Sequence, residues 1–217
     1  MSLDLYYMPI SSPCRTVLLA AEAIGISLNL KEIDIFANEH LKPEYEQLNP
    51  QKTIPFLVDG DYKLTESRAI MSYLADQYGK NVRLYPQTPV GRALVNHRLH
   101  FDIGTLYRGM KDYYYPVAFG KTKDYNPECY KVFEGAFDVL NKFLDGQDYA
   151  AGRNLTIADL ALAATVSTAE VFGFEVERYT NVGKWMNRIK SLAPGYRKAN
   201  GEGLEILKKL IEDFKKD

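Results

Sequence analysis

The sequence contains little cysteine, no excess of charge of either sign and no long hydrophobic run. Its 217 residues include two cysteines, Cys14 and Cys129, and 27 Lys and Arg against 28 Asp and Glu. Two cysteines cannot form the disulfide framework of a small secreted domain, and they fit a reducing compartment. The balanced charge excludes the basic surface of a general nucleic-acid binder, so we expect no nucleic-acid partner.

Neither a basic leader with an apolar core nor a segment long enough to span a bilayer is visible. We therefore expect a cytoplasmic protein with no membrane partner. Hydrophobic residues make up 46% of the chain, as in an ordinary globular protein, and 16 tyrosines stand beside one tryptophan. Tyrosine combines an apolar ring with a polar end, which suits a pocket or an interface as well as a core.

The first 80 residues alternate short β-rich runs with helical segments. A helix begins at Ser11-Ser12-Pro13, because a hydroxyl caps the first turn and proline lacks an N–H that would be unpaired there. Gly25 ends this helix, and Gly60-Asp61 predicts a β-hairpin. The expected order is β-α-β-α-β-β-α, a small mixed sheet with helices on its faces. Strands are expected at residues 3–7, 28–33, 56–59 and 62–64.

The rest of the chain shows no convincing strand. Residues 81–88 predict a linker between an α/β domain at 1–80 and an all-helical domain at 89–217. Thr156, with Asp159 three residues later, predicts a capping box, and the apolar run that follows predicts a buried central helix. Further helices are expected at 90–115, about 127–144, 181–192 and 204–214.

The junction at residues 6–15 is the most informative segment, since a strand leads directly into a helix N-terminus. Open α/β sheets bind ligands at such junctions, and helix N-termini attract anions. Ser11-Ser12-Pro13-Cys14 has the outline of a redox Cys-x-Pro-Cys motif with serine first. No histidine lies close in sequence to activate that serine as a nucleophile. Its hydroxyl can still donate a hydrogen bond to the thiolate of a ligand.

Two other segments extend this interpretation. Ile54-Pro55 favours a cis peptide bond before a strand, which would turn the backbone N–H and C=O of Ile54 toward an extended peptide. Glu66, Ser67 and Arg68 place a carboxylate, a hydroxyl and a guanidinium at another helix start, a combination that suits an ammonium and a carboxylate together. The three segments predict a pocket for a short, zwitterionic peptide with a thiol.

These motifs resemble those of cytosolic glutathione transferases, most closely the insect delta class. The resemblance extends over nearly the whole chain, and the set of motifs is highly specific. It consists of Tyr-Tyr-x-Pro-x-Ser-Ser-Pro-Cys-Arg at 6–15, Glu-His-Leu-Lys-Pro-Glu at 39–44, Asn-Pro-Gln-x-Thr-Ile-Pro at 49–55, Glu-Ser-Arg-Ala-Ile at 66–70, Tyr-Tyr-Tyr-Pro at 113–116 and Gly-Gln-Asp-Tyr-Ala-Ala-Gly at 146–152. The resemblance implies a thioredoxin-like N-terminal domain, an all-helical C-terminal domain and a homodimer.

The resemblance also implies an activity, the conjugation of glutathione to hydrophobic electrophiles. Glutathione is then a co-substrate, with no metal and no bound cofactor. Ser11 matches the catalytic serine that stabilises the glutathione thiolate. Residues that would bind glutathione are His40, Lys52, Thr53, Ile54, Pro55, Glu66, Ser67, Arg68 and Asp102, the last reaching the glutathione of the neighbouring subunit. Residues that would bind the electrophile are Met8, Tyr107, Met110, Tyr115, Phe119 and Leu207.

Two positions depart from the family pattern. Ile10 stands where glycine is usual, which predicts a stiffer or displaced loop before Ser11. Lys52 replaces a histidine that helps bind the glycyl carboxylate, and lysine keeps a charged donor there. These departures leave open a non-catalytic carrier of apolar ligands as the alternative function.

Four simpler or competing interpretations stand beside these assignments. Ser11 could be only a helix cap, and Cys14 could be a reactive thiol that exchanges disulfides. Dehydrohalogenation or peroxide reduction with glutathione could take place in the same pocket. His97, His100 and Asp102 could suggest a metal site, but their spacing provides no strong third ligand, so we expect a surface or subunit-contact role for the two histidines.

Overall fold

The computed structural model describes residues 3–214, and its N-terminal part is built on a four-stranded mixed sheet. The strands are β1 (Leu3–Tyr7), β2 (Asn29–Glu32), β3 (Phe56–Asp59) and β4 (Tyr62–Leu64), in the spatial order β2-β1-β3-β4. β1 runs parallel to β2 and antiparallel to β3, and β3 and β4 form the predicted hairpin. The predicted order of elements along the chain, β-α-β-α-β-β-α, and the mixed sheet are confirmed. β2 is an exposed edge strand.

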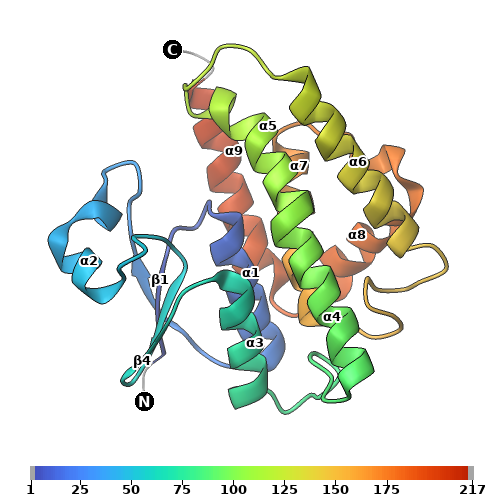
Figure 1. The fold of residues 1–217 in the computed structure, drawn as a ribbon, viewed down its shortest axis with the longest axis horizontal. Coiled ribbons are helices and arrows are strands. Elements are labelled where there is room, and N and C mark those ends of the chain that lie inside the picture. Colours follow the sequence, from blue (N-terminus) through green and yellow to red (C-terminus); the bar gives the residue numbers. More distant parts are fainter. Residues whose placement is uncertain (1–2, 215–217) are drawn as a thin grey trace.

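Helices cover both faces of this sheet. They are α1 (Ser12–Ile24), the 3₁₀ turn η1 (Glu39–Leu41), α2 (Pro43–Leu48) and α3 (Ser67–Tyr78). Figure 1 shows α1 and α3 between the sheet and the remaining helices, with α2 on the opposite side. Gly25 adopts a φ of 83° at the end of α1, and its N–H donates to the Ala21 and Glu22 carbonyls, as its sequence position predicts.

The C-terminal part is helical throughout the residues that the structure describes. Its elements are α4 (Pro89–Phe101), the π-helical turn η2 (Asp102–Leu106), α5 (Tyr107–Ala118), α6 (Pro127–Phe143), α7 (Ile157–Val171), η3 (Val176–Arg178), α8 (Thr180–Leu192), the π-helical turn η4 (Arg197–Gly201) and α9 (Glu202–Phe214). The single helix expected at 90–115 is wrong in one respect, because η2 interrupts it. Such π-turns commonly occur at functional sites, and this one begins at the buried Asp102.

The central helix of this part is α7, in which every residue from Ile157 to Ala169 is buried. Asp159 closes its N-terminus by accepting hydrogen bonds from the Thr156 N–H at 2.9 Å and the Thr156 hydroxyl at 2.8 Å. The same carboxylate accepts from the Ala150 N–H at 2.7 Å and the Trp185 indole at 3.0 Å. The predicted capping box therefore also joins α7 to α8 and to the preceding loop.

The segment between α3 and α4 is packed against the helical part. Leu84 and Tyr85 are buried, and the Leu84 carbonyl accepts a hydrogen bond from the Ile157 N–H at 2.9 Å. The sheet and the helices thus share one continuous core, in which α1 packs against both α3 and α7.

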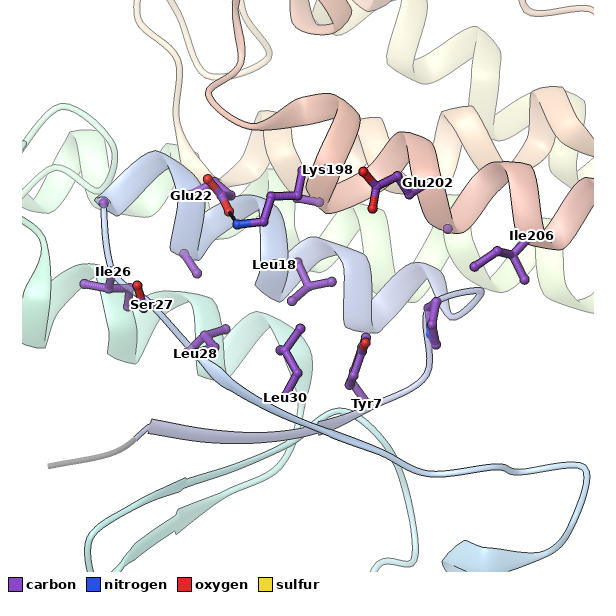
Figure 2. Close-up of a pocket in the computed structure, with 15 residues that line it drawn as sticks. Tyr7, Leu18, Glu22, Ile26, Ser27, Leu28, Leu30, Lys198, Glu202 and Ile206 are labelled. Atoms are coloured by element: carbon purple, nitrogen blue, oxygen red, sulfur yellow. Dashed lines mark hydrogen bonds and ion pairs between the residues drawn. The ribbon is translucent and has the colours of Figure 1, made fainter.

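A cavity of about 610 Å³ lies between α1, the segment that leads into β2, and the η4–α9 region (Figure 2). Within residues 3–214, no helix combines the length and the hydropathy that crossing a bilayer would need.

Candidate active site

The register of the sheet brings three of the predicted site segments to the same end. Tyr6 lies opposite Phe56, so the loop after β1 leaves the sheet beside the turn that enters β3. Leu57 lies opposite Leu64, so the loop after β4 leaves the sheet at that end as well. Because α1 and α3 begin directly after these loops, their N-termini face the same region.

Ser11 is the N-cap of α1. Its hydroxyl oxygen accepts the Cys14 N–H at 3.4 Å, a long hydrogen bond, and the side chain is half-buried. A serine hydroxyl has a second lone pair and its own proton. It can therefore donate a hydrogen bond to a ligand while it accepts the weak cap bond. The cap role and the predicted role in catalysis are therefore compatible.

Cys14, in the first turn of α1, is fully buried. Burial raises the pKa of its thiol to about 11, although the Ser11 hydroxyl and the Arg15 charge act in the opposite direction. A reactive cysteine needs an accessible thiolate near neutral pH. The structure therefore disfavours disulfide exchange through Cys14.

Arg15 is a site residue that sequence reasoning missed. Its guanidinium is completely buried and donates to Asn200 Oδ1 at 2.9 Å, to the Ile10 carbonyl at 3.2 Å and to the Thr168 hydroxyl. Burial lowers its pKa to about 10, so the group stays charged at neutral pH. Arg15 thus joins the loop before Ser11 to α7 and η4, and the buried Ile10 takes part through its backbone carbonyl.

The Ile54-Pro55 peptide bond is cis, which confirms the prediction. The Thr53 carbonyl is occupied, because the Tyr45 hydroxyl donates to it at 2.7 Å and the Asn49 amide at 2.8 Å. By contrast, the N–H and the C=O of Ile54 have no hydrogen-bond partner among residues 3–214. These two groups are available to an extended peptide lying beside them.

Glu66 precedes α3 in a strained backbone conformation, with φ at 65° and ψ at 101°. A non-glycine residue in such a region costs about 1–3 kcal/mol, and such residues cluster at functional sites. Its side chain is exposed and makes no capping bond to the helix. The conformation therefore presents the carboxylate to solvent next to the N-terminus of α3.

We expect Glu66→Gly to raise the free energy of unfolding by about 1 kcal/mol, since glycine adopts positive φ without a steric penalty but has more entropy to lose. Urea denaturation measures this change. Glu66→Ala is the matched control, because it removes the same carboxylate and keeps a Cβ. Equal stability of the two variants would show that the backbone at Glu66 is not strained.

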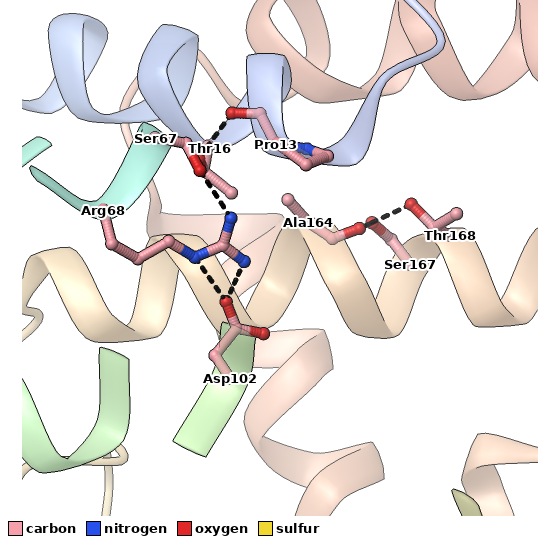
Figure 3. A network of polar contacts seen from close by, with 8 residues as sticks. All are labelled: Pro13, Thr16, Ser67, Arg68, Asp102, Ala164, Ser167 and Thr168. Carbon is pink, nitrogen blue, oxygen red and sulfur yellow. Dashed lines mark hydrogen bonds and ion pairs between the residues drawn. The ribbon is translucent and has the colours of Figure 1, made fainter. Parts of the chain in front are cut away.

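Ser67, Arg68 and Asp102 form a buried polar network (Figure 3). Arg68 donates to the Ser67 hydroxyl oxygen at 2.7 Å, and its Nε donates to Asp102 Oδ2 at 3.0 Å, with Nη2 completing the ion pair. Asp102 is 0% exposed, and its Oδ1 has no partner among the described residues. Asp102 thus lies inside this chain and holds Arg68, and its contact with the glutathione of a neighbouring subunit stays a prediction.

Comparisons with known proteins show the family of this chain. Residues 5–82 match the family model of the glutathione S-transferase N-terminal domain, and residues 101–193 match that of the C-terminal domain. A delta-class glutathione transferase of Nilaparvata lugens is 46% identical, with a TM-score of 0.94 over 97% of this chain and 99% of that one.

The chain belongs to the glutathione transferase family. A Bombyx mori glutathione transferase is 38% identical, with a TM-score of 0.93 over 97% of this chain and 98% of that one. A glutathione transferase homologue of Drosophila mojavensis, solved with bound glutathione, is 30% identical, with a TM-score of 0.90 over 98% and 97% of the two chains. The thioredoxin-like domain, the helical domain and the similarity to insect delta-class enzymes are thus confirmed.

The two residues expected at the glycyl end of glutathione differ in their side-chain contacts. His40 lies in η1, half-buried, and its Nδ1 has no partner among the residues described. Lys52 adopts a φ of 54° and pairs with Glu46 at 2.8 Å, so its ammonium is engaged. Lys52 can bind a glycyl carboxylate only if it shares or leaves this ion pair.

The residues expected around the electrophile divide into two groups. Met110 and Leu207 are buried, at 0% and 2% exposure, and their role in binding the electrophile stays a prediction. The rings of Tyr107 and Tyr115 pack edge-on with centroids 6.5 Å apart, and burial raises the pKa of both hydroxyls. Phe119 packs edge-on against Tyr115 with ring centroids 5.1 Å apart. Together with the half-buried Met8, these three residues remain the candidate lining.

Two aromatic residues at this edge of the transferase were not predicted. Phe36, in the loop after β2, contacts Phe119 at 5.6 Å and Phe214 of α9 at 6.5 Å between ring centroids. Phe36 and Phe214 are about half exposed, at 47% and 49%. An aromatic bridge therefore joins the N-terminal domain to α5 and α9. The sequence signal was weak, since an isolated Phe in a polar loop has no periodic partner.

The suggested metal trio has no support in residues 3–214. No group of three His, Cys, Asp or Glu side chains there could hold a metal ion. His97 and His100 are exposed on α4, whereas Asp102 points inward to Arg68.

Proposed function

We propose that this transferase conjugates glutathione to hydrophobic electrophiles, with the Ser11 hydroxyl stabilising the glutathione thiolate. The observation that supports the proposal best is the position of Ser11 at the N-terminus of α1, beside the unpaired backbone of Ile54 and the N-terminus of α3. The relative with bound glutathione shares this fold.

The proposed mechanism depends on the thiol pKa. A free thiol with a pKa of about 8.5 is only a few per cent ionised at pH 7, and each unit of pKa depression corresponds to about 1.4 kcal/mol. A hydrogen bond from Ser11 and the positive end of α1 both favour the charged sulfur. No covalent enzyme intermediate is needed, because the thiolate itself attacks the electrophile.

Glutathione binding is assigned to three segments. The backbone of Ile54, after Thr53 and before Pro55, pairs with the cysteinyl residue. Glu66 binds the γ-glutamyl ammonium, while Ser67 and the N-terminus of α3 bind its carboxylate. Arg68 positions Ser67, and Asp102 balances the charge of Arg68.

The remaining assignments concern the rest of the molecule. Residues 1–80 form the glutathione-binding domain, residues 81–88 the linker and residues 89–217 the domain that shapes the electrophile pocket. His40 and Lys52 bind the glycyl end. The protein acts as a homodimer in the cytoplasm, where its two free cysteines stay reduced. Dehydrohalogenation and peroxide reduction are side activities of the same pocket.

Turnover of chlorodinitrobenzene with glutathione tests the proposal. We expect a saturable rate in both substrates. A protein that binds hydrophobic dyes but shows no turnover with this or other electrophiles would instead support the carrier, the alternative that Ile10 and Lys52 left open.

A separate variant tests disulfide exchange. We expect Cys14→Ala to leave kcat/KM essentially unchanged and to lower the free energy of unfolding by about 1 kcal/mol, because it leaves a small cavity beside α1. A large loss of turnover in this variant, with Ser11→Ala fully active, would assign the chemistry to Cys14.

A further inference from the structure

The cavity between α1 and α9 is separate from the proposed active site. Ser11, Ile54 and Ser67 are not among the residues that line it. The wall between the two regions is the close approach of Gly203 in α9 to Pro9, where an added Cβ would lie 2.3 Å from the Pro9 carbonyl oxygen. The volume of about 610 Å³ lies within the range of pockets that bind small organic ligands, about 300–1,000 Å³.

Most of the cavity surface is apolar. The cavity is lined by Leu18 of α1, by Leu28 just before β2 and Leu30 within it, and by Ile206 of α9 (Figure 2). Leu30 and Ile206 are large hydrophobic residues that remain 45% and 49% exposed. Ligand pockets typically combine such apolar walls with a few polar groups that fix orientation.

The charged residues of the lining are Glu22, Lys198 and Glu202, which leaves one net negative charge. Lys198 donates to Glu22 at 2.8 Å. The pKa of Lys198 is raised by this hydrogen bond, by the charge of Glu22 and, to a smaller extent, by that of Glu202. The carboxylate of Glu202 is exposed and makes no hydrogen bond or salt bridge among residues 3–214, whereas its backbone N–H donates to the Arg197 carbonyl. The cavity therefore offers an unpaired carboxylate next to an apolar wall.

We propose that this cavity binds lipophilic organic cations, amines whose apolar body lies on Leu18, Leu28, Leu30 and Ile206 and whose ammonium approaches Glu202. An ammonium there gains a carboxylate partner without breaking the ion pair of Glu22 and Lys198. A carboxylate ligand of the same shape would face two acidic side chains and would have to compete for Lys198. The preference for a cation follows from this charge balance.

A matched pair of fluorescent probes tests the charge preference. Dansylcadaverine has a primary amine on a dansyl group, and dansyl-aminohexanoate has a carboxylate at the end of a similar chain. We expect dansylcadaverine to bind with enhanced, blue-shifted emission and an affinity about tenfold higher than the carboxylate probe, a difference of about 1.4 kcal/mol. We also expect saturating S-hexylglutathione, which should occupy the proposed active site, not to displace the amine.

Variants locate the bound probe. Ile206→Lys places a cation at the mouth of the cavity and is expected to weaken dansylcadaverine binding about tenfold or more. Leu192→Lys is the matched control, since Leu192 is an exposed hydrophobic residue, at 61%, on α8 and away from the cavity lining. Glu202→Gln is expected to reduce the preference for the amine without abolishing binding of its dansyl body.

Four results would contradict the proposed cation site. Absence of dansylcadaverine binding, equal affinity for both probes, displacement by S-hexylglutathione or an unaffected Ile206→Lys variant would each overturn the proposal. The measurement is direct binding without glutathione, so it does not depend on the proposed conjugation activity. Circular dichroism of each variant verifies that its fold is intact.

Discussion

Replacing Ser11 with Ala is expected to lower kcat/KM by about 10²–10³-fold, the loss typical of removing one hydrogen-bond donor to a developing or stabilised anion. Without the donor the thiol form of bound glutathione is favoured, so its pKa should rise toward that of the free thiol, near 8.5. The loss should then be largest near neutral pH and should shrink as pH rises and the thiol ionises unaided. The pH profile of kcat/KM and the ultraviolet absorbance of the bound thiolate both measure this change.

Two controls separate catalysis from capping. Ser11 also caps α1, so Ser11→Ala should lower the free energy of unfolding by about 0.5–2 kcal/mol, whereas Ser11→Gly should lower it by only a few tenths. Both variants should show the same catalytic defect if the hydroxyl is responsible. Ser12→Ala removes the neighbouring, buried hydroxyl and should retain activity. An unchanged thiol pKa in Ser11→Ala would refute the proposed mechanism.

Asp102→Ala is expected to lower the free energy of unfolding by about 3–5 kcal/mol, because it leaves the buried Arg68 guanidinium without its counter-charge. The side chains of this pair are only 9% and 0% exposed, so solvent cannot replace the missing carboxylate. Urea denaturation at neutral pH measures the effect.

The matched control is the exposed pair of Arg92 and Asp76, which has side-chain exposures of 31% and 48%. Asp76→Ala should cost less than about 1 kcal/mol, as surface ion pairs do. The double variant Arg68→Met/Asp102→Leu removes both charges and should recover much of the stability that Asp102→Ala loses. A loss in Asp102→Ala no larger than in Asp76→Ala would show that the buried pair is not structurally important.

Local patterns predicted much of the fold. The caps at Ser11 and Gly25, the Gly60 hairpin and the capping box of Thr156 and Asp159 each depend on residues a few positions apart, so periodicity and turn chemistry were sufficient. The interruption of the helix after Phe101 was not predictable in this way. A π-turn has no distinct residue pattern, and here it accompanies the burial of Asp102 against Arg68, which is 34 positions away in sequence.

In the candidate site, too, local motifs identified some residues and gave no indication of others. Ser11, Pro55 and Glu66 were identified from local motifs and lie at the ends of neighbouring elements. The burial of Met110 and Leu207 was not predictable from local motifs, because the same apolar side chains serve a core and a pocket equally well. The contacts of Arg15 with Asn200 and Thr168 join residues more than 150 positions apart, and no local pattern indicates them.

The amino-acid sequence by itself determined the order of the elements, the caps that start and end them, and the family motifs around Ser11. These features depend on short-range backbone preferences and on residue types that act within one turn. Tertiary structure alone decided which charges are buried, which carbonyls and N–H groups remain unpaired, and where an apolar surface stays open. Those properties arise only when distant segments pack together and exclude water from some side chains and not from others.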